Sequence, residues 1–132
     1  MKIHVVNKYF ALLDQDTQVI LECKIVPKNF VISGPEITKL LKSLDINPES
    51  LTFQVKATAY LKPTDTFNAE TGRRVAESKA MRKVFYKLAV LNLKLQEIVL
   101  DEIINDTDRY MSALANEEAH FNKLSNEQTT NS

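Results

Sequence analysis

Seven basic or aromatic side chains between positions 73 and 87 have the types and the spacing to bind phosphate groups. They are Arg73, Arg74, Lys79, Arg82, Lys83, Tyr86 and Lys87. Lysine and arginine neutralise phosphates, and a tyrosine among them can stack on a base, so the cluster is typical of a nucleic-acid contact. On a helix, the basic side chains from Lys79 to Lys87 would lie opposite the apolar side chains of the same segment. A solvated helix face and a dock for an acidic protein are the alternatives that the sequence leaves open.

Few other residues have the types or the spacing for chemistry. His4 and His120 stand near opposite ends of the sequence, and the single cysteine, Cys23, has no second thiol for a disulfide or a shared metal. With two glycines in all, the chain has no glycine-rich phosphate loop. We therefore expect no catalytic residues, no metal and no cofactor, and a protein that is not an enzyme.

Charge is distributed unevenly along the chain, although the net charge is zero. Met1–Asn68 holds eight lysines and seven acidic residues, a net charge of +1. Ala69–Lys94 holds seven basic and two acidic residues (+5), and Leu95–Ser132 holds two basic and eight acidic residues (−6). Such asymmetry favours either a basic helix that faces a polyanion or an acidic segment that docks on that helix.

The size and composition are those of one ordinary soluble domain. The chain has 132 residues, of which 44% are hydrophobic and 26% charged. No apolar run approaches the roughly 20 residues that cross a bilayer, and the first residues lack the apolar core and cleavage site of a signal peptide. We expect a cytoplasmic protein without membrane contact. Its predicted parts are an α+β domain over residues 1–104 and a C-terminal helix and frayed tail over residues 105–132.

The first half of the sequence predicts two antiparallel strands, a short helix and a third strand. Tyr9–Leu13 and Val19–Val26 are β-prone runs on either side of the turn sequence DQDT. Ser33 followed by Glu36 resembles a capping box and predicts a helix over residues 35–44. The later stretch LTFQVKATAYL alternates apolar and polar residues, which is the period of a strand. Its apolar members are Phe53, Val55, Ala57, Ala59 and Leu61.

A long helix is predicted to follow this strand. Pro63 ends the strand because proline cannot donate a ladder hydrogen bond, and Asn68 is placed to cap the helix N-terminus. An apolar stripe then recurs at helical spacing through Met81, Val84, Phe85, Leu88, Leu91 and Leu95. Gly72, Ala76 and Ala80 form a row of small residues beside it. This row predicts that the helix backbone lies close to a sheet or to another helix.

The stripe continues through Ile103 and Ile104 to the sequence NDTD, whose side chains predict the start of a last helix over residues 107–124. We therefore expect an α+β fold, with a three-stranded antiparallel sheet packed against a long helix and a C-terminal helical extension. A mostly helical protein with a small hairpin is the alternative. The stripe from Met81 to Ile104 covers about 36 Å of helix, more than a three-stranded sheet can cover, so we expect a homo-oligomer, most simply a dimer.

The segment ATAYLKPTDTFNAETGRRVAESKAMRK resembles a group of small proteins from bacteriophages and related mobile elements. In that group a strand runs into a turn and helix with the pattern P-x-D-x-F-x4-G-x3-A, followed by basic residues. The matching residues are Pro63, Asp65, Phe67, Gly72 and Ala76. The resemblance covers about a quarter of the chain. It implies a phage or mobile-element context, and it carries no established activity.

The order of predicted elements is also similar to that of the double-stranded-RNA-binding domain, in which a three-stranded antiparallel sheet precedes a helix with basic residues near its start. This chain differs by having a helix between the second and third strands. It also lacks the first helix, which that domain uses for minor-groove contact. The similarity therefore implies an arrangement of elements more than an RNA-binding surface.

Three functions remain as hypotheses. The first is a nucleic-acid-binding accessory protein of a phage or mobile element, with DNA and RNA both open. The second is a protein-binding module that inhibits or modulates a host factor through the acidic C-terminal segment. The third is a virion or assembly component that oligomerises through the apolar stripe. The three differ in which part of the chain makes the contact.

Overall fold

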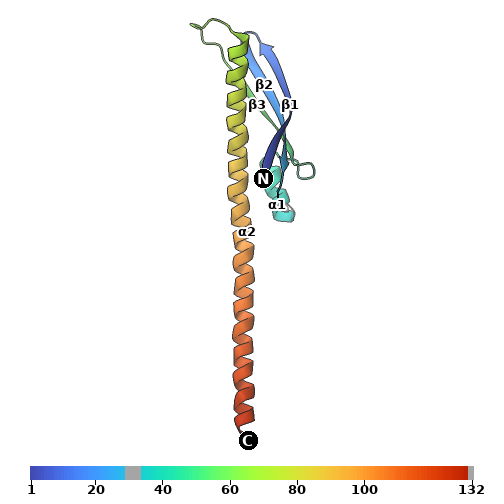
Figure 1. The fold of residues 1–132 in the computed structure, drawn as a ribbon, viewed down its shortest axis with the longest axis vertical. Helices are drawn as coiled ribbons and strands as arrows, with labels where there is room; N and C mark the ends of the chain where they lie inside the picture. Colours follow the sequence, from blue (N-terminus) through green and yellow to red (C-terminus); the bar gives the residue numbers. More distant parts are fainter. Residues whose placement is uncertain (29–33, 131–132) are drawn as a thin grey trace. The chain divides into compact units, whose positions relative to one another are not determined.

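The computed structural model describes residues 1–28 and 34–130 and has an α+β fold (Figure 1). Its elements are the strands β1 (Lys2–Leu13), β2 (Asp16–Val26) and β3 (Thr52–Ala59) and the helices α1 (Pro35–Ser43) and α2 (Ala69–Thr130). The strands form one antiparallel sheet in the order β1-β2-β3, so β2 lies in its centre. The predicted three-stranded sheet and long helix are confirmed.

β1 and β2 form the predicted hairpin, and both strands are longer than the β-prone runs suggested. Leu13 pairs with Asp16, which leaves a two-residue turn that begins with Asp14. Asp14 has a φ of 64°, in the left-handed region that two-residue hairpin turns require and that aspartate adopts more readily than most residues. The register shifts between Val5 and Asn7, as at a β-bulge.

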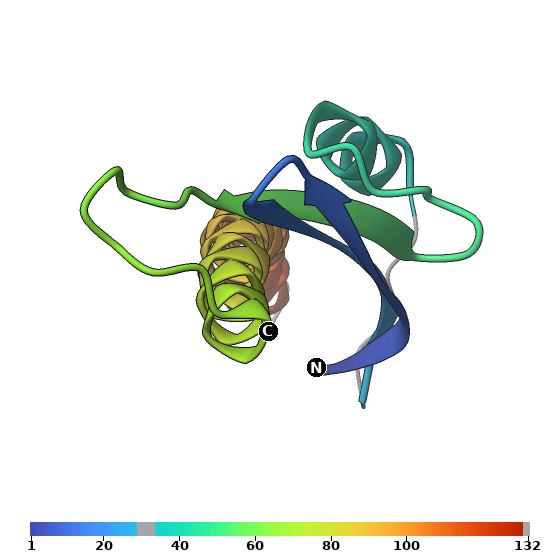
Figure 2. The same ribbon diagram turned by 90° about the horizontal axis from the view of Figure 1, so that it is seen from above.

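The core of the sheet lies on the face that packs against α2. The buried side chains are Val19, Leu21, Cys23 and Ile25 from β2, and Phe53, Val55, Ala57 and Ala59 from β3. The period of two predicted for β3 is confirmed, since its four apolar side chains are at most 7% exposed. Figure 2, which looks along α2, shows the sheet curving around one side of this helix.

α1 is a short helix that adds Ile37 and Leu41 to the buried side chains. It begins at Pro35, as the sequence predicted. Gly34 occupies its N-cap with a φ of 109°, a conformation that glycine adopts without strain, and no side chain caps the helix. The predicted capping residue, Ser33, lies outside the described residues.

α2 begins at the predicted place. The Oδ1 atom of Asn68 accepts a hydrogen bond from the backbone N–H of Thr71 at 3.0 Å, which confirms the predicted cap. A Cβ atom at Gly72 would lie 2.4 Å from the Oγ1 atom of Thr17, so glycine is needed for the close approach of the helix to β2. The two alanines of the predicted small-residue row are fully buried. The prediction that this row lies close against a sheet is confirmed.

The buried face of α2 differs from the predicted stripe at one large residue. Val84 and Leu91 have no exposed surface, whereas Phe85 is 58% exposed. Successive residues are turned by about 100° around a helix, so the residue after Val84 points away from the sheet. The prediction that Phe85 belongs to the same stripe as Val84 and Leu91 is wrong.

The chain divides into two compact units, and the first unit ends at Leu95. The sequence had predicted that the first domain extends to residue 104. All buried side chains of the described residues belong to this first unit. α2 runs through residues 105–108 without a break and reaches Thr130, so the predicted start of a separate last helix is wrong. The fraying of the tail stays a prediction. Instead of capping a new helix, the Thr107 hydroxyl donates to the carbonyl of Ile103 at 3.0 Å, a bond within a continuous helix.

Within residues 1–28 and 34–130, no helix is both long enough and apolar enough to cross a membrane.

Candidate nucleic-acid interface

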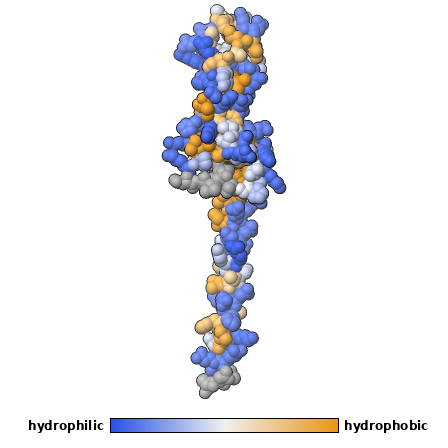
Figure 3. Space-filling view, turned by 90° about the vertical axis from the view of Figure 1, so that its right-hand side faces the viewer, coloured by the Kyte–Doolittle hydropathy of each residue, from blue (hydrophilic) through white to orange (hydrophobic). Residues whose placement is uncertain are grey.

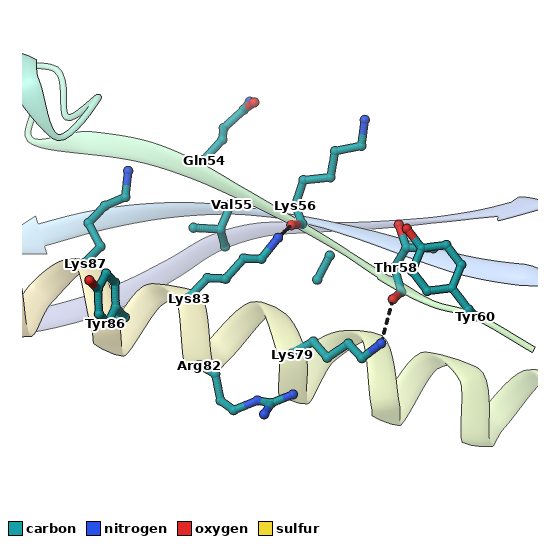
Figure 4. Close-up of a pocket in the computed structure, with 11 residues that line it drawn as sticks. Gln54, Val55, Lys56, Thr58, Tyr60, Lys79, Arg82, Lys83, Tyr86 and Lys87 are labelled. Atoms are coloured by element: carbon teal, nitrogen blue, oxygen red, sulfur yellow. Dashed lines mark hydrogen bonds between the residues drawn. The ribbon is translucent and has the colours of Figure 1, made fainter.

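A groove of about 1050 Å³ runs between the outer edge of β3 and α2 (Figure 4). The strand side contributes polar side chains from β3, namely Gln54, Lys56 and Thr58, and Tyr60 directly after the strand. The helix side contributes Lys79, Arg82, Lys83, Tyr86 and Lys87 from α2. Five of the side chains from the two sides are basic, and the described lining contains no acidic one. The groove is therefore a concentrated positive surface on a protein with a net charge of zero.

Three lysines of α2 donate hydrogen bonds from Nζ to backbone carbonyls. Lys79 donates to Thr58 at 3.1 Å, Lys83 to Lys56 at 2.5 Å and Lys87 to Leu44 at 2.6 Å. Figure 4 shows the first two bonds crossing from α2 to β3. The lysines are four residues apart, a rise of about 6 Å along the helix between neighbours. Their ammonium groups therefore stand in a row along the groove.

The row depends on the position of β3 at the edge of the sheet. In an antiparallel strand the N–H and C=O of one residue point to the same side, and neighbouring residues point to opposite sides. Lys56 and Thr58 present their carbonyls to the free edge, where the lysines donate to them. Positive charges along an open edge also discourage pairing with another strand, so the row has a structural role besides any binding role.

The hydrogen bonds orient the three ammonium groups without neutralising them. A lysine ammonium has three N–H donors, and each bond to a carbonyl uses one. A carbonyl oxygen carries no formal charge, so each lysine keeps its full positive charge. Two donors per lysine remain for an anion, and the anchoring bond has already reduced the rotational freedom that binding would remove.

Two exposed tyrosines stand toward opposite ends of the groove (Figure 4). Tyr60 is 71% exposed and Tyr86 is 74% exposed. The Nζ atom of Lys79 lies 5.4 Å from the centre of the Tyr60 ring, a cation–π distance that holds the ring beside the lysine row. Exposed aromatic rings beside cations are the combination that proteins use to bind single strands.

The structure brings five of the seven predicted residues into the groove, and two lie elsewhere. Arg73 and Arg74 do not line it, and Arg74 forms an exposed ion pair with Glu70 at 2.6 Å. Lys83 and Lys87 flank the buried face of α2 and reach past it to backbone carbonyls, so their predicted position opposite that face is wrong.

Sequence reasoning missed the basic and the aromatic groove residue that come from the strand side. Lys56 and Tyr60 belong to the polar face of the alternating stretch, and Figure 4 shows the Lys56 side chain pointing away from α2. The alternation was visible in the sequence, and it placed both residues off the core. Only the edge position of β3 brings them next to the basic residues of α2.

The other chemistry-bearing residues are separate from the groove. Cys23 has no exposed surface, and burial raises the pKa of its thiol because the thiolate loses its hydration. Cys23 is therefore a small residue of the core. His4 and His120 are exposed. Among the described residues, no group of three or more His, Cys, Asp or Glu side chains is placed to hold a metal ion.

Comparisons with known proteins assign no family to the chain. It matches no family model, no curated protein and no solved structure. What the groove binds is therefore inferred from its own side chains.

Proposed function

We propose that the protein binds single-stranded nucleic acid in the groove between β3 and α2 and has no enzymatic activity. The observation that carries the proposal is the row of three lysine ammonium groups with exposed tyrosines toward both ends. The proposed setting is the cytoplasm of a cell that carries a phage or mobile element. This setting rests on the resemblance of the segment from Pro63 to Ala76 to proteins of such elements.

Phosphate binding is supported by the spacing of the three lysines and by the N–H donors that each of them keeps free. The three lysines follow one another along α2 at a rise of about 6 Å, so an extended strand laid along the groove can meet them one after another. Each keeps two free donors, as described above. Arg82 adds a further cation, because it is exposed and makes no hydrogen bond or ion pair with the described residues. Four side chains of α2 are therefore available to four phosphates.

The tyrosines support a single strand over a duplex. In a duplex the bases are stacked on one another inside the helix and offer no free face to a protein ring. In a single strand each base can stack on an aromatic side chain, which contributes about 1–3 kcal/mol per base. The exposed rings of Tyr60 and Tyr86 would be unused by a duplex.

The first test is a salt titration of binding to a fluorescent single strand of about 12 nucleotides, with a duplex of the same sequence alongside. Each neutralised phosphate on a single strand contributes about −0.7 to the slope of log K against log salt, so four contacts give about −3. We expect affinity to fall about 50-fold between about 50 mM and about 200 mM salt, and the single strand to bind tighter than the duplex. No binding of either at tens of micromolar protein and low salt would exclude the proposal, leaving a solvated face or a dock for an acidic protein.

The second test uses matched substitutions on the exposed surface of α2. Arg82→Glu removes a groove cation, and we expect it to weaken binding roughly tenfold and to reduce the salt slope by about 0.7. Arg73→Glu makes the same charge change on the same helix outside the groove and should change affinity less than about twofold. Tyr86→Ser should weaken single-strand binding and leave the salt slope unchanged, because it removes stacking and no charge. Equal effects of Arg82→Glu and Arg73→Glu would mean that the groove is not the site.

A further inference from the structure

The part of α2 from residue 96 onward carries large apolar side chains that nothing in the described chain covers. Its exposed members are Leu100, Ile103, Ile104, Tyr110, Met111, Leu114, Phe121 and Leu124, each between 47% and 68% exposed. No residue from 96 to 128 is buried. Figure 3 shows hydrophobic side chains recurring at the surface along this part of the helix, in the lower part of the view.

The spacing of these side chains is that of a coiled coil. Positions 100, 107, 114 and 121 are seven residues apart, and positions 103, 110, 117 and 124 form a second series three residues further on. These two series are the a and d positions of a heptad repeat, whose mean spacing of 3.5 residues keeps one seam facing another helix. Six of the eight positions are apolar, and the exceptions are Thr107 and Glu117.

Between residues 100 and 124, the acidic side chains are divided between outward positions and positions in or beside the seam. Asp101, Glu102 and Asp108 occupy b and c positions, which point away from a partner helix. Glu117 is the one charged residue at an a or d position between residues 100 and 124. A second helix therefore meets one carboxylate in the seam itself, and Asp106 and Glu118 lie at the flanking g and e positions.

We propose that residues 96–128 form an antiparallel two-stranded coiled coil with a second copy of this chain, in a register centred on Ser112. In this register each a position faces a d position of the partner. Leu100 meets the partner's Leu124, Ile103 the partner's Phe121, Tyr110 the partner's Leu114 and Thr107 the partner's Glu117. Every apolar seam residue from 100 to 124 meets an apolar one, and the two polar residues meet each other. The seam residues of one helix therefore match those of an identical helix that runs in the opposite direction. For this reason we infer that the partner helix belongs to a second copy of the chain.

The parallel arrangement fits less well because it sets every residue against itself. Glu117 would then face the partner's Glu117 at a d position, and two like charges in a seam repel each other. In the antiparallel register Glu117 faces a hydroxyl group. At the flanking positions Asp106 lies near the partner's His120, and no two acidic residues face each other. The dipoles of antiparallel helices also attract, whereas those of parallel helices repel.

The register is specific because shifting it by one heptad breaks the matching. A shift of seven residues in one direction sets Glu117 against the partner's Leu100, and a shift in the other direction sets it against the partner's Leu114. The proposed register also pairs residue 96 with residue 128. The overlap therefore uses the whole exposed segment and starts directly after Leu95, where the first compact unit ends.

The oligomeric state tests the seam. The chain has a mass of 15.0 kDa, so we expect light scattering after gel filtration to give about 30 kDa for the wild-type protein. Leu114→Glu should give a monomer, because it places a charge in the seam. Ser112→Glu adds the same charge two residues away at an outward f position and should remain a dimer. A monomeric wild type at about 100 μM, a larger oligomer, or equal loss of the dimer in both variants would overturn the proposal.

Cysteine cross-linking tests the orientation and the register. The native Cys23 has no exposed surface, so the wild-type chain serves as background. We expect a mixture of Leu100→Cys and Leu124→Cys proteins to form a disulfide-linked heterodimer on mild oxidation. Leu124→Cys alone should form none, because antiparallel copies hold the two cysteines about 36 Å apart. Cross-linking of Leu124→Cys to itself, without the mixed product, would establish a parallel pair and overturn the proposed arrangement. Circular dichroism checks that each variant keeps its helix.

Discussion

The two parts of α2, residues 69–95 and residues 96–128, carry similar apolar side chains and bury them to opposite extents. Val84 and Leu91 have no exposed surface, whereas Leu100 and Leu114 are 56% and 51% exposed. The hydrophobic pattern of a helix shows that it has an apolar face. Whether that face is covered depends on what lies against it, and the sheet is present only for the first part.

The two parts also differ in the kind of surface that their sequences suit. The first part begins with Gly72 and two alanines, which let the helix backbone approach β2 closely. The second part has no such row, and its large side chains follow a heptad spacing suited to another helix. A row of small residues lets the helix backbone pack closely against a sheet. Large apolar residues at heptad spacing favour packing against another helix.

The largest effect is expected where a charge is placed on the covered face. Val84→Asp buries an unpaired carboxylate in the core, and we expect the free energy of unfolding to fall by at least about 4 kcal/mol, enough to unfold the first unit. Phe85→Asp changes the neighbouring residue, which is 58% exposed, and should cost less than about 1 kcal/mol. Urea unfolding followed by circular dichroism measures both. Similar losses in the two variants would mean that Phe85 is covered in solution.

A smaller effect is expected where α2 approaches the sheet most closely. Gly72→Ala adds a Cβ atom that would meet Thr17, so we expect a loss of about 1–2 kcal/mol even though alanine favours a helix. The double variant Gly72→Ala with Thr17→Ala removes the clashing hydroxyl and should recover part of the loss. Ser78→Ala, at an exposed position of the same helix, serves as the propensity control. A gain in stability for Gly72→Ala alone would show that the approach is looser than described.

The smallest effect is expected when asparagine is replaced by alanine at two different positions of the chain. Asn68 caps α2, so Asn68→Ala should cost about 1 kcal/mol in the free energy of unfolding. Asn105 lies inside the continuous helix, so Asn105→Ala should be neutral or stabilise the helix by about 0.5 kcal/mol. Thermal unfolding of both variants gives the comparison. A loss for Asn105→Ala as large as that for Asn68→Ala would indicate a helix start near residue 105 in solution.

Local patterns in the sequence were enough to predict most elements of the first unit. The alternation from residue 51 to residue 61 predicted β3, because neighbouring residues of a strand point to opposite faces. The side chain of Asn68 predicted the start of α2, because a cap bonds an N–H group only a few residues away. The same reasoning failed at residues 105–108, since capping side chains also fit inside a helix when the flanking turns favour it.

The candidate site depends on contacts that no local pattern contains. The sequence by itself determined that a basic helix follows a strand, and five residues of that helix line the groove. Only the tertiary structure decided that the strand is an edge strand, that Lys56 and Tyr60 join the groove, and that Lys83 bonds to a carbonyl 27 residues away. The physical reason is the distance along the sequence over which each interaction acts. Helix periodicity and capping are set by neighbours within a few residues. The row of lysines is set by carbonyls far away in the sequence, two on the free edge of β3 and one at Leu44.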